Sequence, residues 1–367
     1  MSLRVLISGG GTGGHIYPAL AIADGLRRSR PDVEILFVGA EGKMEMERVP
    51  RAGYEITGLP VSALHRKLDA RNLNFPFRLV RSLAKATKVV RRFRPDVAIG
   101  TGGFASGPAL FAASMLGVPV FVQEQNAYPG ATNRLLGKVA QSVFTAYTEA
   151  DQYFASAKTR LTGNPLRSAL DPQALPDQAA SRQRYQLDPL KHTLLSFGGS
   201  LGSLALNEAH TKLTAFWRSH PQLQLIWQTG EGYYDRYKQT ATAQLPNVHC
   251  TPYLEGMASA YAAADLVMCR AGALSIAELQ LLGKAAILIP SPNVAGDHQT
   301  ANARAVEAAG GAVVVTDDQL LAQLPDLIAS LLQDELRLQS LSDNMLMQAR
   351  PEATQSIVDQ LLQHVGS

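Results

Sequence analysis

Three glycine-rich segments of this chain could hold phosphate groups. They are Gly9–Gly14, Gly102–Pro108 and Gly198–Ser203. Each follows a short apolar run typical of a strand. Without side chains, backbone N–H groups can approach an anion closely, and a helix that follows adds the positive end of its dipole. Any one of these segments could be an ordinary tight turn, but three together favour more than one phosphorylated ligand.

Two side chains next to such segments could do chemistry. His15 directly follows the first segment, and an imidazole there could act as the general base that takes a proton from a sugar hydroxyl. The alternative is a structural histidine that caps the loop. Glu278 follows the turn at Gly272, where it could accept hydrogen bonds from two ribose hydroxyls. Its alternative role is that of a favourable charge near a helix N-terminus.

The first segment also satisfies the G-x-G-x-x-G pattern of dinucleotide-binding oxidoreductases. In those proteins an acidic residue follows after about 20 residues, whereas Glu41 lies further along this chain. That interpretation also leaves His15 and the segment at Gly198 unexplained. We see no Asp-x-Asp pair and no cluster of histidines and carboxylates suited to a divalent ion. We therefore expect neither a metal nor a cofactor.

Apolar runs alternate with helical stretches along the chain, which predicts βαβ units and mostly parallel sheets. The expected strands of the first half are 4–8, 34–38, 97–100, 118–123 and 142–146. Those of the second half are 193–197, 223–227, 248–253, 266–269, 285–289 and 312–315. Residues 164–189 contain four prolines and little apolar periodicity, which predicts a linker. We expect two doubly wound α/β domains with the active site in a cleft between them.

The composition is that of an ordinary globular protein. The chain has 367 residues, of which 46% are hydrophobic and 18% charged, and this length favours two domains. Its first residues read as a strand and lack the features of a signal peptide. No apolar run reaches the roughly 18 residues that a membrane-spanning helix needs. We therefore expect a cytoplasmic protein with, at most, a peripheral membrane contact.

Charge is distributed unevenly along the chain. Residues 1–165 contain 21 Lys and Arg against 12 Asp and Glu, whereas the remaining residues contain 13 against 19. Ten basic residues fall between Arg66 and Arg94, where Asp69 is the only acid. This pattern indicates an anionic partner surface, although a solvated helix face has the same composition. Nucleic acid is disfavoured because no aromatic residues for base stacking are interleaved with the basic ones.

A helix is expected from about Pro76 to Arg92, since proline is a helix start signal. Its basic face comprises Arg78, Arg81, Lys85, Lys88 and Arg92. Its apolar face, which should pack on the sheet, comprises Leu79, Leu83, Ala86, Val90 and Phe93. Leu73, Phe77 and Val80 flank the basic face. They could form a partly buried helix edge, or they could enter anionic lipid together with Arg78, Arg81 and Lys85.

Seven motifs give the chain a resemblance to the MurG family of bacterial glycosyltransferases over essentially its whole length. They are Gly10–His15, Gly102–Pro108, Glu124–Asn126, Gly163–Arg167, Gly198–Ser200, Arg270–Leu274 and Asp297–Gln299. The family implies the GT-B architecture, in which two Rossmann-like doubly wound parallel-sheet domains face each other across a cleft. Residues 1–165, joined by the last helix at about 351–365, would form the domain that faces the acceptor and the membrane. Residues 166–345 would bind UDP-GlcNAc.

The resemblance implies an inverting transfer of GlcNAc from UDP-GlcNAc to the 4-hydroxyl of MurNAc in undecaprenyl-pyrophosphoryl-MurNAc-pentapeptide (lipid I). The product would be lipid II, a precursor of peptidoglycan. The enzyme would work without a cofactor, as a peripheral protein at the cytoplasmic face of the inner membrane, with anionic lipid and cell-wall synthesis proteins as candidate partners. The alternative is another lipid-acceptor sugar transferase, such as a diacylglycerol glycosyltransferase.

By the same resemblance, the UDP-GlcNAc site would comprise Thr12, Gly13, Gly14, His15, Asn126, Arg167, Ser200, Leu254, Ala273, Leu274, Ser275, Ile276, Ala277, Glu278 and Gln299. Arg167 and Ser200 would meet the pyrophosphate and Gln299 the GlcNAc hydroxyls, while His15 would be the catalytic base. The acceptor pyrophosphate would lie on Gly13, Gly14, Gly102, Gly103 and Ser106. Two residues depart from the family. Leu201 replaces a common glutamine and Phe104 a common tyrosine, which removes an amide and a hydroxyl.

Overall fold

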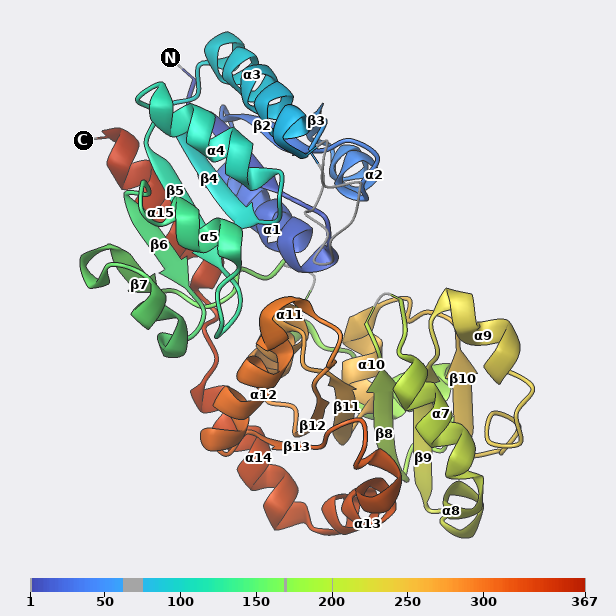
Figure 1. Cartoon of the computed structure of the whole chain (residues 1–367). Coiled ribbons are helices and arrows are strands. Elements are labelled where there is room, and N and C mark those ends of the chain that lie inside the picture. Colours follow the sequence, from blue (N-terminus) through green and yellow to red (C-terminus); the bar gives the residue numbers. More distant parts are fainter. Residues whose placement is uncertain (1, 62–74, 168–169, 200, 367) are drawn as a thin grey trace. The chain divides into compact units, whose positions relative to one another are not determined.

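The chain forms two compact α/β units in the computed structural model (Figure 1), which describes all residues except 1, 62–74, 168–169, 200 and 367. Unit 1 comprises residues 1–167 and 350–367, and unit 2 comprises residues 168–349. Two residues with predicted roles, Leu73 and Ser200, lie outside the described residues.

Unit 1 is built on a seven-stranded sheet in the order β3-β2-β1-β4-β5-β6-β7, and every neighbouring pair is parallel. The strands are β1 (Arg4–Gly9), β2 (Glu34–Ala40), β3 (Glu55–Leu59), β4 (Val97–Gly102), β5 (Val120–Glu124), β6 (Ser142–Thr145) and β7 (Thr159–Leu161). The strand order reverses between β1 and β4. Ligands of doubly wound sheets bind at the carboxyl ends of the strands at such a point, and two of the glycine-rich segments follow these two strands.

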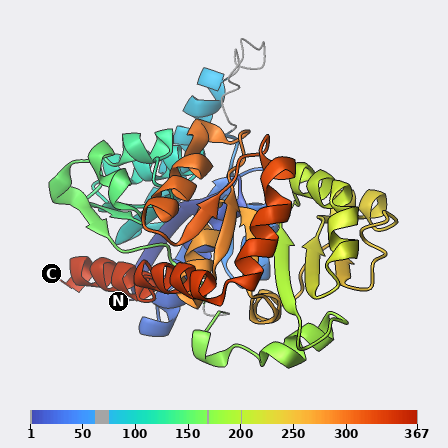
Figure 2. The ribbon, with the colours of Figure 1, turned by 90° about the horizontal axis from the view of Figure 1, so that it is seen from below.

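Helices cover both faces of this sheet. They are α1 (Gly13–Ser29), α2 (Glu45–Arg51), α3 (Phe75–Phe93), α4 (Ser106–Met115), α5 (Ala131–Leu136) and α15 (Ala353–Gly366). Side chains alternate along β1 because successive residues of a strand point to opposite faces. Val5 and Ile7 join a core with α1 and α15, whereas Leu6 joins a core with α3 and α4. Figure 2 shows α15 alongside α1, where it returns the end of the chain to unit 1.

Unit 2 repeats the architecture with a six-stranded parallel sheet in the order β10-β9-β8-β11-β12-β13. The strands are β8 (His192–Phe197), β9 (Leu223–Gln228), β10 (Val248–Thr251), β11 (Leu266–Arg270), β12 (Ala286–Ile289) and β13 (Ala312–Val314). The helices are α6 (Gln178–Arg184), α7 (Leu204–Lys212), α8 (Thr214–Ser219), α9 (Glu231–Tyr237), α10 (Met257–Ala263), α11 (Ala273–Leu282), α12 (His298–Ala308), α13 (Leu320–Gln333) and α14 (Glu335–Met347). The reversal falls between β8 and β11. The predicted pair of doubly wound parallel sheets is confirmed.

The predicted linker at 164–189 was drawn too long. Asn164 is buried within unit 1, where its side-chain amide donates to the carbonyl of Gln125. Near the other end of the segment, α6 packs on α10, and the guanidinium of Arg182 pairs with Asp265 at 2.7 Å. Both ends of the segment therefore belong to the units. The chain passes from unit 1 to unit 2 between residues 167 and 168, and it returns to unit 1 between residues 349 and 350.

Candidate active site

The first two glycine-rich segments touch each other within unit 1. The N–H of Gly10 donates to the carbonyl of Gly102 at 3.3 Å. Gly103 has a φ of +83°, and a Cβ there would lie 2.1 Å from the oxygen of Gly10. Only glycine fits this close approach. The two predicted phosphate-binding segments thus form one surface at the carboxyl ends of β1 and β4.

His15 lies on this surface with one ring nitrogen held by the chain. Its Nδ1 is 3.0 Å from the carbonyl oxygen of Gly10 and 3.3 Å from Oγ1 of Thr12. A carbonyl oxygen can only accept, so Nδ1 carries the proton in the neutral ring, and Nε2 holds the basic lone pair. Nε2 faces the second segment, because a Cβ at Gly102 would lie 3.1 Å from it. This nitrogen therefore lies beside the glycines of the second segment.

The start of α1 offers N–H groups to an anion. Thr12 stands at the N-cap with an extended backbone, but its side chain makes no capping hydrogen bond. The first N–H groups of a helix, here those of Gly13 and Gly14, have no intrahelical acceptor. They also carry the positive end of the helix dipole. The N–H groups of Gly13 and Gly14 can therefore donate to an anionic ligand.

Ser106 does not share that role. Its side chain is fully buried, and its Oγ donates to the carbonyl of Gly103 at 2.8 Å. The hydroxyl thus shapes the second segment, and any contact with a phosphate would have to come from its backbone. The ring of Phe104 lies against Gly11, with a ring carbon 3.2 Å from the position of a Cβ there. Phe104 therefore packs between the two segments where the family commonly has tyrosine.

Two buried carboxylates, Glu124 and Glu45, accept hydrogen bonds from the residues of this surface or from its neighbours. Only Glu124 belongs to one of the seven sequence motifs. Glu124 ends β5, and its oxygens accept from the N–H of Asn126, the N–H of Gly130 and the side-chain amides of Asn126 and Asn133. Burial raises the pKa of Glu124. Asn126 is thus positioned by Glu124. Glu45 on α2 accepts from the N–H groups of Gly11 and Ala40, both at 2.9 Å. Sequence reasoning missed it, because Glu45 lies more than thirty residues from its loop partner.

Arg167 is not brought to this surface. Its Nε lies 3.2 Å from Oδ2 of Asp24, which also belongs to unit 1. Asp24 is nine residues beyond His15 on α1, a distance of about 14 Å along the helix axis. The predicted contact of Arg167 with a pyrophosphate would have to come from a guanidinium that Asp24 already engages at Nε.

In unit 2, the third glycine-rich segment connects β8 to α7. Ser203 caps α7, with Oγ 3.5 Å from the N–H of Leu206. Gln228 holds the segment at two points, accepting from the N–H of Gly198 and donating to the carbonyl of Gly199. Arg270 donates from Nε to Oγ of Ser203 at 2.9 Å. Leu201 is 82% exposed, so the side chain that departs from the family makes little contact with the fold.

Arg270 is itself fixed by an ion pair. Its two terminal nitrogens reach the two oxygens of Asp317 at 2.5 and 3.1 Å. Such two-point pairs set the plane of a guanidinium. Arg270 therefore stabilises the start of α7 through its hydrogen bond to Ser203. The sequence motif that contains Arg270 did not predict this role.

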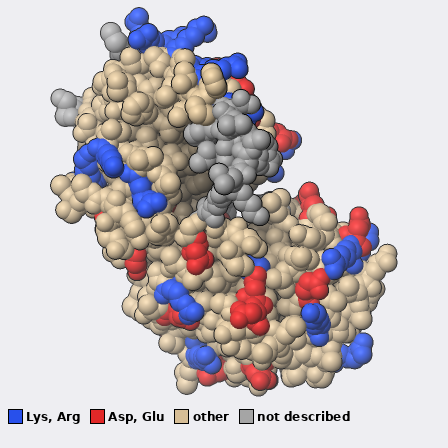
Figure 3. All heavy atoms as spheres, in the orientation of Figure 1, with Lys and Arg blue, Asp and Glu red and all other residues tan. Residues whose placement is uncertain are grey.

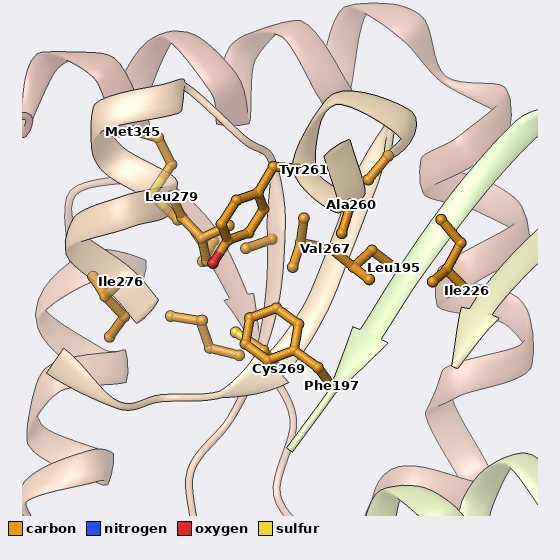
Figure 4. Packing of buried hydrophobic residues seen from close by; sticks show 14 of the residues in the cluster. Leu195, Phe197, Ile226, Ala260, Tyr261, Val267, Cys269, Ile276, Leu279 and Met345 are labelled. Carbon is orange, nitrogen blue, oxygen red and sulfur yellow. The ribbon is translucent and has the colours of Figure 1, made fainter. Parts of the chain in front are cut away.

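Glu278 lies on α11 with one oxygen already engaged. The hydroxyl of Tyr261 donates to its Oε2 at 2.7 Å. Figure 4 shows the ring of Tyr261 within the core of unit 2, with its hydroxyl oxygen among the labelled side chains. Burial raises the pKa of Glu278 to about 7, and the hydrogen bond from Tyr261 opposes this rise. Its second oxygen remains available to a ligand hydroxyl.

Several predicted donor-site residues use their side chains for packing. Ile276 is fully buried, and Leu254 and Ala273 are nearly so, all within or beside the core of unit 2. Any contact of these three with a nucleotide would come from backbone groups, such as the N–H groups that begin α11 after Gly272. Leu274, Ser275 and Ala277 are partly exposed on the same helix. Gln299 begins α12, and its Oε1 accepts from the N–H of Ser291 at 2.8 Å, which leaves its NH₂ group to donate.

The described part of α3 presents the predicted surface features. Phe77 is 74% exposed and Val80 is 65% exposed, so neither forms a buried helix edge. Arg78, between these two residues, and Arg81, directly after Val80, are exposed as well. Lys85 pairs with Glu41 at 2.7 Å, which offsets one of the predicted positive charges. In Figure 3, Lys and Arg side chains gather on the surface over α3.

Two searches over the described residues bear on metals and membranes. Within this part of the chain, no group of three or more His, Cys, Asp and Glu residues could hold a metal ion. Among the described helices, none is both long and apolar enough to cross a bilayer.

Comparison with known protein families gives two matches. Glycosyltransferase family 28 N-terminal domain matches residues 5–145, and Glycosyltransferase family 28 C-terminal domain matches residues 193–360. These ranges contain the sheets of the two units almost completely.

Curated proteins match along nearly the full length. The chain is 45% identical over 362 residues to the UDP-N-acetylglucosamine--N-acetylmuramyl-(pentapeptide) pyrophosphoryl-undecaprenol N-acetylglucosamine transferase of Bacteroides thetaiotaomicron, covering 98% of this chain and 97% of that protein. It is 46% identical to the transferase of the same name from Porphyromonas gingivalis, with 98% and 95% covered.

Solved structures share the fold. The crystal structure of MurG from Acinetobacter baumannii superposes with a TM-score of 0.78 at 29% identity, covering 98% of this chain and 99% of that one. A UDP-N-acetylglucosamine 2-epimerase has a TM-score of 0.67 at 13% identity, covering 100% of this chain and 97% of its own. The second similarity extends to the fold alone.

Proposed function

This chain belongs to glycosyltransferase family 28, and on that premise we propose that it transfers GlcNAc from UDP-GlcNAc to lipid I, forming lipid II for peptidoglycan synthesis. The observation that carries the proposal is 45% identity, over 98% of the chain, to a transferase named for this donor and acceptor. The site geometry supports it, because each unit presents a glycine-rich segment at its switch point. An inverting transfer between two phosphorylated substrates needs two such anion-binding surfaces.

Unit 2 binds the donor in this proposal. The ionised carboxylate of Glu278 accepts from the ribose hydroxyls through the oxygen that Tyr261 leaves available. The diphosphate lies on the segment that includes Ser200 and on the start of α11, whose dipole favours negative charge. The NH₂ group of Gln299 donates to the hydroxyls of GlcNAc. Backbone groups of Leu254 and Ala273 contact the nucleotide, while their side chains remain in the core.

Unit 1 binds the acceptor and supplies the base. The acceptor pyrophosphate lies on the N–H groups of Gly13, Gly14 and Gly103, and Asn126 lines the same site. The 4-hydroxyl of MurNAc attacks the anomeric carbon of GlcNAc, and its proton passes to Nε2 of His15. The bond between that carbon and the UDP oxygen breaks, and UDP leaves with the electron pair. The configuration at the carbon inverts because attack and departure occur on opposite sides.

The charge that develops on UDP is stabilised without a metal in this mechanism. Backbone N–H groups and a helix N-terminus are preorganised donors, which stabilise charge without reorganising during the reaction. Arg167 joins them through its guanidinium, which can form two parallel hydrogen bonds with a phosphate, whereas Asp24 accepts one. We therefore predict that turnover survives chelation by EDTA. If EDTA abolished activity and Mg²⁺ restored it, the metal-free mechanism would be refuted.

In this proposal, the exposed residues near the start of α3 contact the membrane. The exposed apolar side chains of Phe77 and Val80, together with Leu73, enter the anionic inner leaflet at its cytoplasmic face, and Arg78 and Arg81 pair with lipid phosphates. Such a peripheral contact would bring unit 1 to its lipid-linked acceptor. Lys85 contributes less than Arg81 because Glu41 already pairs with Lys85.

The decisive experiment measures transfer from radiolabelled UDP-GlcNAc to synthetic lipid I. Diacylglycerol serves as a second acceptor, since a diacylglycerol glycosyltransferase would share the fold. We expect a labelled disaccharide-linked lipid from lipid I alone. Transfer to diacylglycerol without transfer to lipid I would refute the proposed acceptor.

A further inference from the structure

The fully buried carboxylate of Glu45 and the ring of His15 bind opposite sides of one peptide group. The N–H of Gly11 donates to Oε2 of Glu45 at 2.9 Å. The carbonyl oxygen of Gly10 lies 3.0 Å from Nδ1 of His15. This N–H and this carbonyl belong to the single peptide bond between Gly10 and Gly11. Because a trans peptide is planar, its N–H and its carbonyl point in opposite directions, so the three groups form one continuous chain of hydrogen bonds.

We infer that Glu45 is a positioning residue that orients and polarises His15 through the Gly10–Gly11 peptide. The inference rests on the proposed function, in which His15 is the base. A carboxylate that accepts from Gly11 draws positive charge onto that N–H and leaves more negative charge on the carbonyl of Gly10. Successive hydrogen bonds in a chain strengthen one another. The carbonyl therefore holds the proton on Nδ1 more strongly and stabilises the imidazolium that forms when Nε2 takes a proton. A carboxylate that contacts a histidine directly acts in the same way in hydrolase triads.

The surroundings of Glu45 are built to keep its carboxylate in this place. Its second oxygen, Oε1, accepts from the N–H of Ala40 at the end of β2. A Cβ at Gly10 would lie 2.2 Å from Oε1, and one at Gly39 would lie 2.6 Å from the side chain of Glu45. Glycine at these two positions makes room for the carboxylate. A buried charge without such partners would be strongly destabilising, so its placement under the loop has a specific cause.

Other groups around His15 act on it differently. The dipole of α1 places positive potential at its start, which opposes the imidazolium. Glu124 reaches the neighbourhood only through the side-chain amide of Asn133, whose nitrogen would lie 3.4 Å from a Cβ at Gly102. Tyr17 lies one turn along α1 beside Gly13. Among these groups of unit 1, Glu45 alone shares a peptide group with the hydrogen bond to Nδ1.

The test is an NMR titration of His15 in the full-length protein, with Glu45→Gln compared with the parent. Glutamine keeps the shape and removes the charge. We expect the pKa of His15 to fall by about one unit, which is the size of a tenfold change in an equilibrium. Turnover at neutral pH should fall about tenfold, and the acidic limb of its pH profile should move to lower pH with the His15 titration. UDP affinity should be unchanged, because UDP binds to unit 2.

Glu47→Gln is the matched control. Glu47 lies on the same helix but is exposed and pairs with Arg51. The Glu47→Gln substitution therefore removes the same charge without changing a contact of the loop. Should Glu45→Gln fail to fold, Glu45→Asp withdraws the carboxylate from Gly11 while keeping the charge, and a smaller fall in the His15 pKa is expected.

The inference is overturned if His15 titrates at the same pH in the folded Glu45 variant as in the parent. It is also overturned if Glu47→Gln produces the same shift, because loss of charge anywhere on α2 would then explain the change. The titration needs no substrate. A normal turnover of His15→Ala would therefore refute the base while leaving the effect of Glu45 on His15 measurable.

Discussion

The two units have the same strand order around their switch points but stabilise the loops there in different ways. In unit 1, two glycine-rich segments lie against each other, and a buried carboxylate binds the peptide next to His15. In unit 2, the single segment is held by side chains from neighbouring strands, namely Gln228 and Arg270. The shared fold fixes where a ligand binds, whereas the supporting side chains decide the chemistry.

The ionisable groups show the same difference. His15 is held through a backbone carbonyl that leaves its Nε2 basic. Glu278 is held by Tyr261 in a buried position that raises its pKa to about 7. The first arrangement suits a group that exchanges a proton during the reaction, and the second suits a group that binds hydroxyls. Each prediction below changes one unit and measures whether the function of the other survives.

The largest effect is expected from His15→Ala. Loss of a general base typically lowers turnover by roughly 10²–10⁴-fold, and the affinity for UDP should stay the same because we propose that the donor binds to unit 2. Steady-state kinetics with lipid I and calorimetry with UDP give the two numbers. Near-normal turnover would refute the role of His15 as the base, and with it the proposed difference in chemistry between the two units.

A smaller effect is expected from Gly103→Ala. The new Cβ would lie 2.1 Å from the oxygen of Gly10, so the two segments must separate, and displacements of about 1 Å at a site can cost roughly 10²-fold in rate. Gly117→Ala is the control, because Gly117 also has a positive φ but has nothing within 4 Å of the added Cβ. Both variants should melt at a lower temperature. Only Gly103→Ala should lose turnover, and equal losses would show that backbone strain alone is responsible.

A moderate effect on binding is expected from Glu278→Gln. A hydrogen bond to a neutral amide is weaker than one to a carboxylate by about 1 kcal/mol, so UDP affinity should fall about five- to tenfold. Discrimination against 2′-deoxy-UDP should also fall. The parent should bind UDP more weakly as the pH drops below about 7, because protonation removes the accepting carboxylate. The Gln variant should show no such dependence. Calorimetry between pH 5.5 and 8.5 tests this, and identical pH profiles would return Glu278 to a structural role.

The fold was predictable from the sequence because parallel strands buried on both faces produce continuous apolar runs. All six strands of unit 2 were predicted at nearly their observed positions. β3 and β7 were missed, since β3 contains Gly58 and begins with the charged Glu55, and β7 has only three residues, two of which are exposed. Both lie at sheet edges, where one-sided pairing requires less apolar sequence. Helix α6 was taken for linker because its polar sequence packs through the ion pair of Arg182, which has no periodic signal.

Fewer of the contacts in the candidate site than of the strands in the fold could be predicted from the sequence. Glycine-rich segments and His15 stand next to each other in the chain, so their spacing revealed them. Glu45 and Arg270 act through hydrogen bonds to residues more than thirty positions away, and single residues of that kind carry no local pattern. The burial of Ser106 and Ile276 was equally hidden, because a serine or isoleucine at the start of a helix can face either the core or a ligand.

The smallest effect on the isolated reaction, and the last prediction, concerns α3. Replacing Leu73, Phe77 and Val80 with serine should weaken sedimentation with anionic vesicles several-fold, because exposed apolar side chains gain free energy when they enter lipid. UDP affinity and turnover on a detergent-soluble acceptor should not change, since neither requires a bilayer.

The matched control replaces Leu336 on α14 of unit 2 with serine. Leu336 is 86% exposed but stands between Glu335 and Arg337, whose opposite charges offset each other, so its variant should bind vesicles as the parent does. Added salt should weaken the binding of the parent, because Arg78 and Arg81 act through screened charge. Lys85→Ala should change vesicle binding less than Arg81→Ala, since Glu41 already offsets the charge of Lys85. Equal sedimentation of the triple variant and the parent at every salt concentration would place the membrane contact elsewhere in the chain.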